Sequence, residues 1–263
     1  MSKWAQSNGI LRDEKGVAHI LGLSGGKDST ALAILMSERH PEIPMSYLCT
    51  PTGDELPEMI GHWENLEGII GRPIVRLTNT HPDGGPVTLD TLIRDFGALP
   101  NFRQRWCTRM LKIQPTRAYM KKAHPAKLYV GLRADEPTRE GIFGDGVCSV
   151  FPLREWGMGE ADVWKVLEDH KITVPRRTDC ARCYHQRLIE WKFLLELHPD
   201  IYEDACRQED ATGHTLRTPG RDTWPVDLRG LGAEFLSGRK VQGEKAYRDR
   251  VDRGQSPCRV CSL

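Results

Sequence analysis

The chain has 263 residues, 39% of them hydrophobic, which is enough for one good core and favours a single globular unit. Its 37 Lys and Arg residues nearly balance 36 Asp and Glu residues, so the net charge of +1 neither favours nor excludes a polyanionic partner. No run approaches the roughly 18 to 20 apolar residues of a membrane span, and residues 1–16 lack the apolar core of a signal peptide. We therefore expect a cytoplasmic protein that does not associate with membranes.

Strand-like apolar runs alternate with helical patterns in the first part of the chain. The pattern predicts strands at 17–23, 45–49 and 74–77, with helices at 29–39 and 56–70 between them. Such alternation is typical of an α/β fold. It predicts an open, mostly parallel sheet with helices on both faces.

The same alternation continues as far as about residue 175. The pattern predicts helices at 106–122 and 160–170 and strands at 127–132 and 147–152. This completes an α/β domain over residues 1–175.

The alternation of strand and helix patterns ends after Pro175. We expect residues 176–263 to form a Cys-containing helical and irregular extension packed on the same unit. It should contain a helix through Trp191, a stretch of little periodicity at 212–232 and a short helix before the end of the chain.

A glycine-containing run follows the first predicted strand, and we call it the phosphate loop. At the start of a helix, backbone N–H groups and the positive helix end bind anions, and glycine lets the backbone approach closely. Within this run a lysine adds a charge and two serines add hydroxyl donors, whereas an aspartate beside phosphates makes sense mainly as a Mg²⁺ ligand. The alternative is a plain turn with a capping serine. The run is Ser24-Gly25-Gly26-Lys27-Asp28-Ser29.

The phosphate loop resembles the SGGxDS PP-loop of the ATP pyrophosphatases, in the adenine nucleotide α-hydrolase superfamily, and it is not a Walker A loop. Segment 52–58 (TGDELPE) resembles the D-T-G-x-x-x-P-E-T segment of the PAPS reductase family within that superfamily. Residues 131–133 (GLR) and 152–153 (PL) resemble the G-L-R and P-L-x-x-W segments of that family. The resemblance covers most of residues 17–207.

The resemblance implies cleavage of ATP between its α and β phosphates, so that an acceptor oxygen is adenylated and pyrophosphate leaves. It implies catalytic roles for Lys27, Asp28 and Ser29. The implied binding residues are the whole phosphate loop, Asp54 and Arg133.

Two branches of the family use this fold differently. Sulfonucleotide reductases typically carry a loop without the Lys-Asp pair, whereas Lys27 and Asp28 are both present here. This favours ATP with Mg²⁺, as in the DndC-like members that take part in DNA phosphorothioation, and implies DNA as acceptor and a cysteine desulfurase as sulfur donor. The alternatives are an APS or PAPS reductase, a tRNA or nucleobase thiolation enzyme, and a non-catalytic nucleotide-binding scaffold.

The cysteines include Cys107 and two C-x-x-C pairs, Cys180 with Cys183 and Cys258 with Cys261. Comparison with APS reductases implies a [4Fe-4S] cluster on Cys107, Cys180 and Cys183, with Cys261 or Cys258 replacing a fourth ligand that the matching segment lacks. Zinc suits the same thiolates, and reduced free thiols are a third possibility. The terminal pair could alternatively relay sulfur.

Residues 105–115 resemble the Cys-bearing segment of APS reductases. In a regular helix, Arg105, Arg109 and Lys112 would share one face beside Cys107, where they could contact a phosphate or a cluster. A solvated helix face is the alternative. Arg133 is the stronger phosphate candidate, because ligands of open α/β sheets gather at the carboxyl ends of strands.

Overall fold

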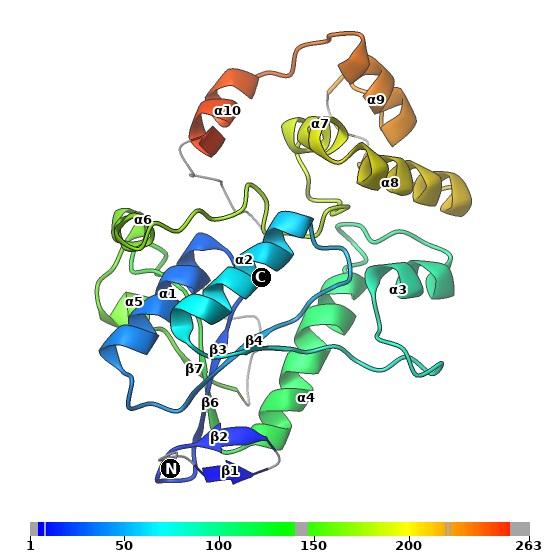
Figure 1. Cartoon of the computed structure of the whole chain (residues 1–263). Coiled ribbons are helices and arrows are strands. Elements are labelled where there is room, and N and C mark those ends of the chain that lie inside the picture. Colours follow the sequence, from blue (N-terminus) through cyan, green and yellow to red (C-terminus); the bar gives the residue numbers. More distant parts are fainter. Residues whose placement is uncertain (1–4, 8, 140–146, 219, 221, 253–263) are drawn as a thin grey trace.

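A five-stranded parallel sheet forms the centre of the computed structural model, which describes residues 5–7, 9–139, 147–218, 220 and 222–252. The strand order is β5-β4-β3-β6-β7 (Figure 1). The predicted α/β sheet is therefore confirmed, although several predicted strands run past the observed ones into the loops that follow them. The strands are β3 (Ala18–Gly22), β4 (Met45–Cys49), β5 (Ile74–Arg76), β6 (Ala126–Tyr129) and β7 (Cys148–Val150).

The order of the strands reverses at β3. From β3 the chain moves to β4 and β5 on one side, then returns to β6 on the other side of β3. Neighbouring strands whose connections lead in opposite directions leave a crevice at their carboxyl ends, and ligands bind there in open α/β sheets. The crevice between β3 and β6 is therefore where a ligand is expected.

One face of the sheet is covered by α1 (Lys27–Arg39), α2 (Pro57–Ile70) and α6 (Glu160–Asp169). The core on this side contains Leu21 from β3, and helix side chains such as Leu32 and Leu66 pack against it. The short helix α5 (Pro152–Glu155) adds Leu153, which is fully buried. Burial of these apolar side chains holds the helices on the sheet.

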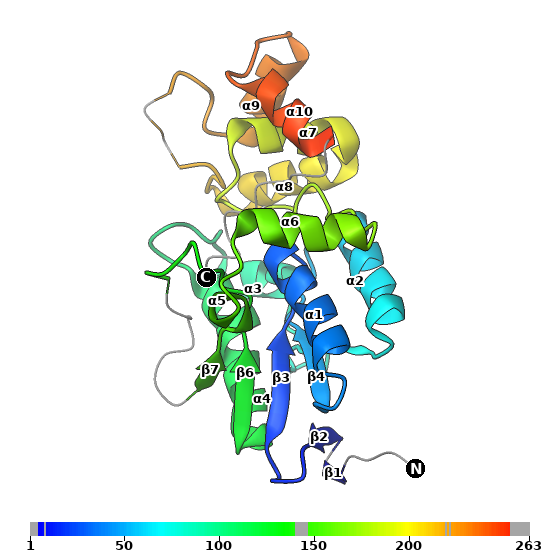
Figure 2. The same cartoon turned by 90° about the vertical axis from the view of Figure 1, so that its left-hand side faces the viewer.

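The opposite face is covered by α4 (Gln114–Ala123), whose Met120 packs near Ile20 and Leu128. Because side chains alternate along a strand, Ile20 points to this face and Leu21 to the other. Helices on both faces were predicted and are confirmed (Figure 2). An antiparallel hairpin of β1 (Ala5–Ser7) and β2 (Ile10–Arg12), which was not predicted, contributes Ile10 to this core.

The chain after residue 176 forms helices that lie beyond the carboxyl ends of the strands (Figure 2). They share a second hydrophobic core with α3 (Leu89–Phe96), which was also not predicted, and with Trp106 and Leu111. The four helices are α7 (Leu188–Leu197), α8 (Pro199–Thr212), α9 (Leu228–Leu236) and α10 (Glu244–Asp252).

The prediction that residues 212–232 are irregular is wrong for the last part of this range, because α9 begins at Leu228. Asp227 caps this helix by accepting a hydrogen bond from the backbone of Gly230 at 2.7 Å. Before the helix, the buried carboxylate of Glu209 accepts hydrogen bonds from the backbones of Leu216 and Leu228, at 2.7 and 2.6 Å. The Glu209 side chain thus holds both ends of the loop before α9, the segment in which the sequence shows little periodicity.

The helix predicted at 106–122 is divided. A π-helix over Thr108–Ile113 follows Cys107, and α4 begins only at Gln114. The wider turn breaks the predicted common face: Arg109 is exposed, whereas Lys112 lines a cavity beside the phosphate loop. Such π-turns inside helices occur often at functional sites.

Among the described residues, no helix is both long and apolar enough to cross a lipid bilayer.

Candidate active site

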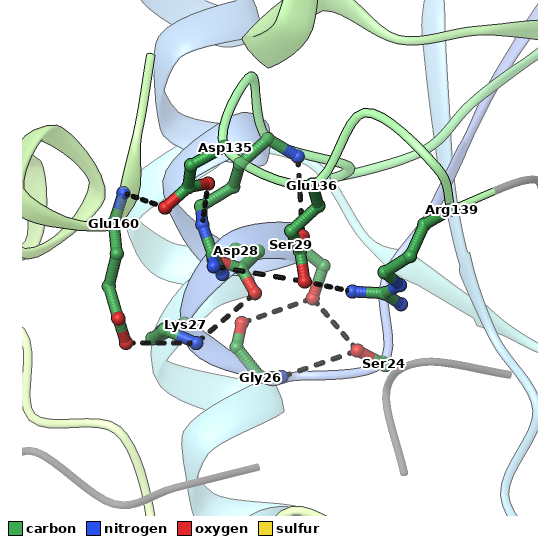
Figure 3. A network of polar contacts seen from close by, with 10 residues as sticks. Ser24, Gly26, Lys27, Asp28, Ser29, Asp135, Glu136, Arg139 and Glu160 are labelled. Carbon is green, nitrogen blue, oxygen red and sulfur yellow. Dashed lines mark hydrogen bonds and ion pairs between the residues drawn. The ribbon is translucent and has the colours of Figure 1, made fainter. Parts of the chain in front are cut away.

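The phosphate loop joins β3 to α1 at the crevice between β3 and β6. Gly26 is the N-cap of α1, so the free N–H groups of the first helical turn point toward this crevice. Ser29 Oγ donates a hydrogen bond to the Gly26 carbonyl and lies 3.1 Å from Ser24 Oγ, which ties the two ends of the loop together (Figure 3). The loop has the geometry of an anion site at a helix N-terminus.

Gly25 must be a glycine for two reasons. Its φ of +81° lies in the left-handed region, and a Cβ there would stand 1.8 Å from Met59 Cε and 3.0 Å from Trp63 Nε1. Both neighbours belong to α2, so the loop is pressed against that helix. The close approach lets the backbone turn toward the crevice.

Three charged side chains converge at the first turn of α1. Asp28 accepts from Arg133 Nη1 at 3.0 Å through Oδ1, and its Oδ2 lies 3.3 Å from Lys27 Nζ. All three side chains are buried to more than four fifths. Both carboxylate oxygens face cations, so Asp28 holds Arg133 in place here, and its Mg²⁺-ligand role stays a prediction.

Carboxylates from two further segments complete this network (Figure 3). Arg133 Nε donates to Asp135 at 2.8 Å, and Arg139 pairs with Glu136 at 2.5 Å. Lys27 Nζ lies 3.6 Å from Glu160 at the start of α6. Burial opposes the charged form of Arg133, but its hydrogen bonds to Asp135 and Asp28 outweigh this effect and raise its pKa, so the side chain stays charged.

Gly131 lets the loop after β6 touch the phosphate loop. A Cβ on Gly131 would lie 2.9 Å from the carbonyl carbon of Asp28 and 3.0 Å from the backbone nitrogen of Ser29. These neighbours are backbone atoms that cannot rotate away. A glycine is therefore required for Arg133, two residues later, to reach Asp28.

A cavity of about 160 Å³ opens beside the phosphate loop. The end of β6 and the loop form one wall, and Glu55, Lys112 and Cys180 line another part. The cavity thus brings together four residues of the predicted loop and one cysteine of the first C-x-x-C, whereas Gly25, Lys27 and Arg133 are not part of its lining. Its lining includes Ser24, Gly26, Asp28, Ser29, Gly131, Leu132, Thr178 and Asp179.

Asp54 has a different position from the one predicted. Its side chain is buried and accepts from Arg182 through both oxygens, from the backbone N–H at 2.8 Å and from Nε at 2.5 Å. Its carbonyl also accepts from the Ala181 N–H at 2.6 Å. Asp54 therefore fixes the C-x-x-C segment, while its neighbour Glu55 lines the cavity.

Lys112 interacts electrostatically with each of the three described cysteines of the predicted metal site. Burial raises the pKa of Cys107, Cys180 and Cys183, and the Lys112 ammonium opposes this rise in each case. Over the described part of the chain, no three His, Cys, Asp or Glu side chains are gathered closely enough to hold a metal ion. These residues as placed do not form a cluster site, and the other two predicted ligands, Cys258 and Cys261, lie outside the described residues.

His62, which was not predicted as a site residue, supports the phosphate loop and the start of α1 through hydrogen bonds. Its Nε2 lies 3.1 Å from Thr30 Oγ1, and the ring is also hydrogen-bonded to the backbone of Gly25. Burial lowers the pKa of His62 to about 4. The ring is therefore neutral at pH 7.

The low pKa of His62 makes the stability of the protein depend on pH. Below pH 6.5 the unfolded chain binds a proton at His62 and the folded chain does not, so the stability falls as the pH drops from 6.5 toward 4. We expect the free energy of unfolding to decrease by about 2 kcal/mol more in the wild type than in His62→Asn between pH 7 and pH 5, measured by urea denaturation. His214→Asn, at an exposed position, should keep the wild-type dependence. Equal losses in wild type and His62→Asn would contradict this role.

Several contributors to the site carried no sequence signal. Asp135, Glu136 and Glu160 lie in loops or at a helix start, where acidic residues are common, and only the fold brings them to Lys27 and Arg133. His62 belongs to the apolar face of α2, and its position there resembles that of any buried core residue.

Residues 18–176, more than half of the chain, match the sequence profile of the phosphoadenosine phosphosulfate reductase domain. None of the curated proteins compared with the chain matches it.

Solved structures similar to this chain are of low sequence identity. They include phosphoadenylyl-sulfate (PAPS) reductase from Candida auris as a phosphate complex, at 14% identity and a TM-score of 0.47, covering 59% of this chain and 74% of the other. NMN synthetase from Francisella tularensis has 15% identity and a TM-score of 0.41, and the alignment covers 91% of this chain and 87% of the other. NH3-dependent NAD synthetase from Campylobacter jejuni has 13% sequence identity and a TM-score of 0.42, and the alignment covers 92% of this chain and 86% of the other. From the match over residues 18–176, the chain belongs to the phosphoadenosine phosphosulfate reductase domain family.

Proposed function

We propose that the protein is an ATP pyrophosphatase that adenylates an acceptor oxygen and so prepares it for replacement by sulfur. The observation that best supports this is the retained Lys27-Asp28 pair, which is buried at the N-terminus of α1 and linked to Arg133. The free helical N–H groups at the start of α1 suit the oxygens of a triphosphate, and Lys27 and Arg133 lie beside them, each paired with carboxylates. Mg²⁺ would accompany ATP as its phosphate-bound counter-ion.

The proposed chemistry has two steps. The acceptor oxygen attacks the α-phosphorus of ATP, a new P–O bond forms, and the α–β bond breaks with pyrophosphate as leaving group. A sulfur nucleophile then bonds to the activated centre, and AMP leaves with the original oxygen. In this proposal Lys27, Arg133 and the Ser29 hydroxyl stabilise charge on the phosphates during the first step.

For the acceptor we propose a DNA backbone phosphate, with a cysteine desulfurase as the source of sulfur and the cytoplasm as the location. The support is the resemblance of the phosphate loop to DndC-like enzymes. Incubation with ATP, DNA, a cysteine desulfurase and ³⁵S-cysteine tests this proposal. We expect ³⁵S in the DNA backbone and DNA-stimulated pyrophosphate release, both lost in Ser29→Ala; transfer of the label to tRNA instead would favour a tRNA-thiolating enzyme.

A sulfonucleotide reductase is the second candidate. Two observations favour it: the family profile that matches the chain, and the position of Cys180 on the wall of the cavity beside the phosphate loop. A reductase would release sulfite from APS or PAPS in the presence of thioredoxin and would not cleave ATP. Sulfite release without any cleavage of ATP would therefore replace the first proposal with this one.

An iron–sulfur cluster, or zinc, on Cys107, Cys180, Cys183 and a terminal cysteine stays a prediction. The described cysteines do not by themselves form a metal site, so no step of the proposed chemistry depends on one. Metal content and the visible spectrum of protein purified without oxygen test it. About four iron atoms per chain would support the cluster, whereas a colourless, metal-free protein would exclude it.

A further inference from the structure

One long segment of the chain carries only positive charge. Asp and Glu make up 36 of the 263 residues, yet none lies between Asp95 and Asp135, whereas nine Lys and Arg residues do. A surface on which both signs are interspersed produces little field, whereas a run of one sign attracts the opposite charge. The net charge of +1 for the whole chain conceals this local excess.

Four exposed side chains of this segment lie on the π-helix and on α4, and we call them the basic surface. Arg109 belongs to the π-helix, Arg117 to the middle of α4, and Lys121 and Lys122 to its last turn. Arg117 and Lys121 are four residues apart and therefore share one face of the helix. The excess of positive charge is thus gathered on one element of the surface.

The basic surface is not explained by the stability of the helix. Lys121 and Lys122 favour the negative end of the helix dipole, but Arg109 and Arg117 lie too far from that end to do so. Like charges at the spacing of Arg117 and Lys121 destabilise a helix. Within the part of the chain that the structure describes, no carboxylate forms an ion pair with Arg109, Lys121 or Lys122. An anionic partner would account for all four residues.

The same helices connect the basic surface to the cavity beside the phosphate loop. Lys112 of the π-helix and Thr116 of α4 line that cavity, whereas the other end of α4 lies next to the start of β6. The helix therefore runs from the carboxyl edge of the sheet to its amino edge (Figure 1), and its 10 residues extend over about 15 Å. A polymer lying on α4 could thus place one of its groups at the cavity.

The composition of the exposed face of α4 favours a phosphate backbone as the ligand. All of α4 is described, and its exposed positions include no large apolar or aromatic side chain. A helix that lies on a membrane needs an apolar face, and sites for single-stranded nucleic acids use aromatic side chains on which bases stack. Duplex DNA needs neither, because it presents about one phosphate charge per 1.7 Å of its axis. The exposed positions are Gln114, Arg117, Ala118, Lys121 and Lys122.

We propose that the basic surface binds the backbone of double-stranded DNA. This inference rests on the proposed function, which takes DNA as the acceptor, and it adds the surface that holds the duplex while one phosphate reaches the cavity. Lys and Arg contacts to phosphates carry no sequence information, and each releases counter-ions from the DNA. The binding is therefore independent of base sequence and weakens steeply with salt.

A variant with three substitutions, Arg109→Gln, Lys121→Gln and Lys122→Gln, removes the charges without changing the helix propensity appreciably. The matched control replaces one arginine and two lysines at other exposed positions for which the structure likewise describes no ion pair. These positions lie in or just before α10, beyond the carboxyl ends of the strands, whereas α4 packs on the sheet (Figures 1 and 2). The control substitutions are Lys240→Gln, Lys245→Gln and Arg250→Gln.

Fluorescence anisotropy with a labelled 30-bp DNA duplex, without ATP and at NaCl concentrations from 50 to 200 mM, tests the proposal. We expect the wild type and the control variant to bind alike, and the basic-surface variant at least tenfold more weakly. Its slope of log K against log salt should be smaller by about two to three, because each phosphate contact contributes about 0.9. Arg109→Gln alone, which leaves α4 intact, should reduce the slope by about one.

Ser29→Ala should bind the duplex like the wild type, so the binding and the cleavage of ATP are tested separately. If ATP is not cleaved but the variants behave as expected, the proposed function fails and the DNA surface stands. The proposal would be overturned if the wild type does not bind the duplex, if the basic-surface and control variants bind it equally, or if double-stranded RNA of the same length binds more tightly than the DNA.

Discussion

Replacing Asp28 with asparagine should lower the rate of pyrophosphate release from ATP by at least about 100-fold. The carboxylate joins Lys27 to Arg133, and an amide of the same size removes the negative charge that holds both cations at the start of α1. Arg133 keeps Asp135 as a partner, so the chain should remain folded with a stability loss of about 1–3 kcal/mol. Steady-state kinetics with circular dichroism and urea denaturation measure both effects.

Asp169→Asn is the control for this substitution. Asp169 is a carboxylate of α6 that pairs with Lys165 and is 57% exposed. Its loss should leave the rate at the wild-type value. An Asp28→Asn enzyme with wild-type turnover would show that the three-charge network does not take part in the reaction.

Gly131→Ala should weaken ATP binding by at least about tenfold. The added methyl group would collide with the backbone of Asp28 and Ser29 at 2.9 to 3.0 Å, so either the phosphate loop or the loop after β6 must move. Either movement separates Arg133 from Asp28 and shifts the helical N–H groups away from the phosphates. Overpacking of this kind typically costs about 1–3 kcal/mol of stability.

Gly68→Ala is a suitable control, because the added Cβ meets nothing within 4 Å and the position lies within α2. It should bind ATP like the wild type and be more stable by up to about 1 kcal/mol. Titration with a non-hydrolysable ATP analogue separates binding from turnover. Wild-type affinity in Gly131→Ala would mean that the contact between the two loops is not required for the nucleotide.

The sequence predicted the parts of the fold that depend on local patterns. Buried strands such as Met45–Cys49 are mostly apolar, and the helix after the phosphate loop follows from the largely apolar run at its centre. The parallel sheet and its covered faces follow from the order of these elements. Helices α3 and α9 were missed because each is short, and α9 contains two glycines that lower its helical propensity.

The parts of the site that were not predicted depend on contacts distant in sequence. The π-helix after Cys107 has no pattern that distinguishes it from an α-helix, and within it Lys112 lines the cavity while Arg109 is exposed. The motif containing Asp54 suggested a ligand contact, but the fold brings Arg182 from the C-x-x-C segment to its carboxylate. A motif thus located the correct region but not the partner of each side chain.

The same distinction applies to function. The phosphate loop, Gly131 and Arg133 lie within the 18–176 match that establishes the family, and their geometry suits a nucleotide phosphate. The acceptor would be recognised by surfaces outside the loop, and no motif in the sequence specifies them.

The products formed from α-³²P-labelled ATP test the central claim most directly. The full chain would be incubated with Mg²⁺ and the labelled nucleotide, with and without DNA, and the products separated by thin-layer chromatography, with Ser29→Ala in parallel. We predict labelled AMP from the wild type and none from Ser29→Ala, because cleavage occurs between the α and β phosphates. Labelled ADP, or unchanged ATP under every condition, would contradict the assignment of the phosphate loop as an ATP pyrophosphatase site.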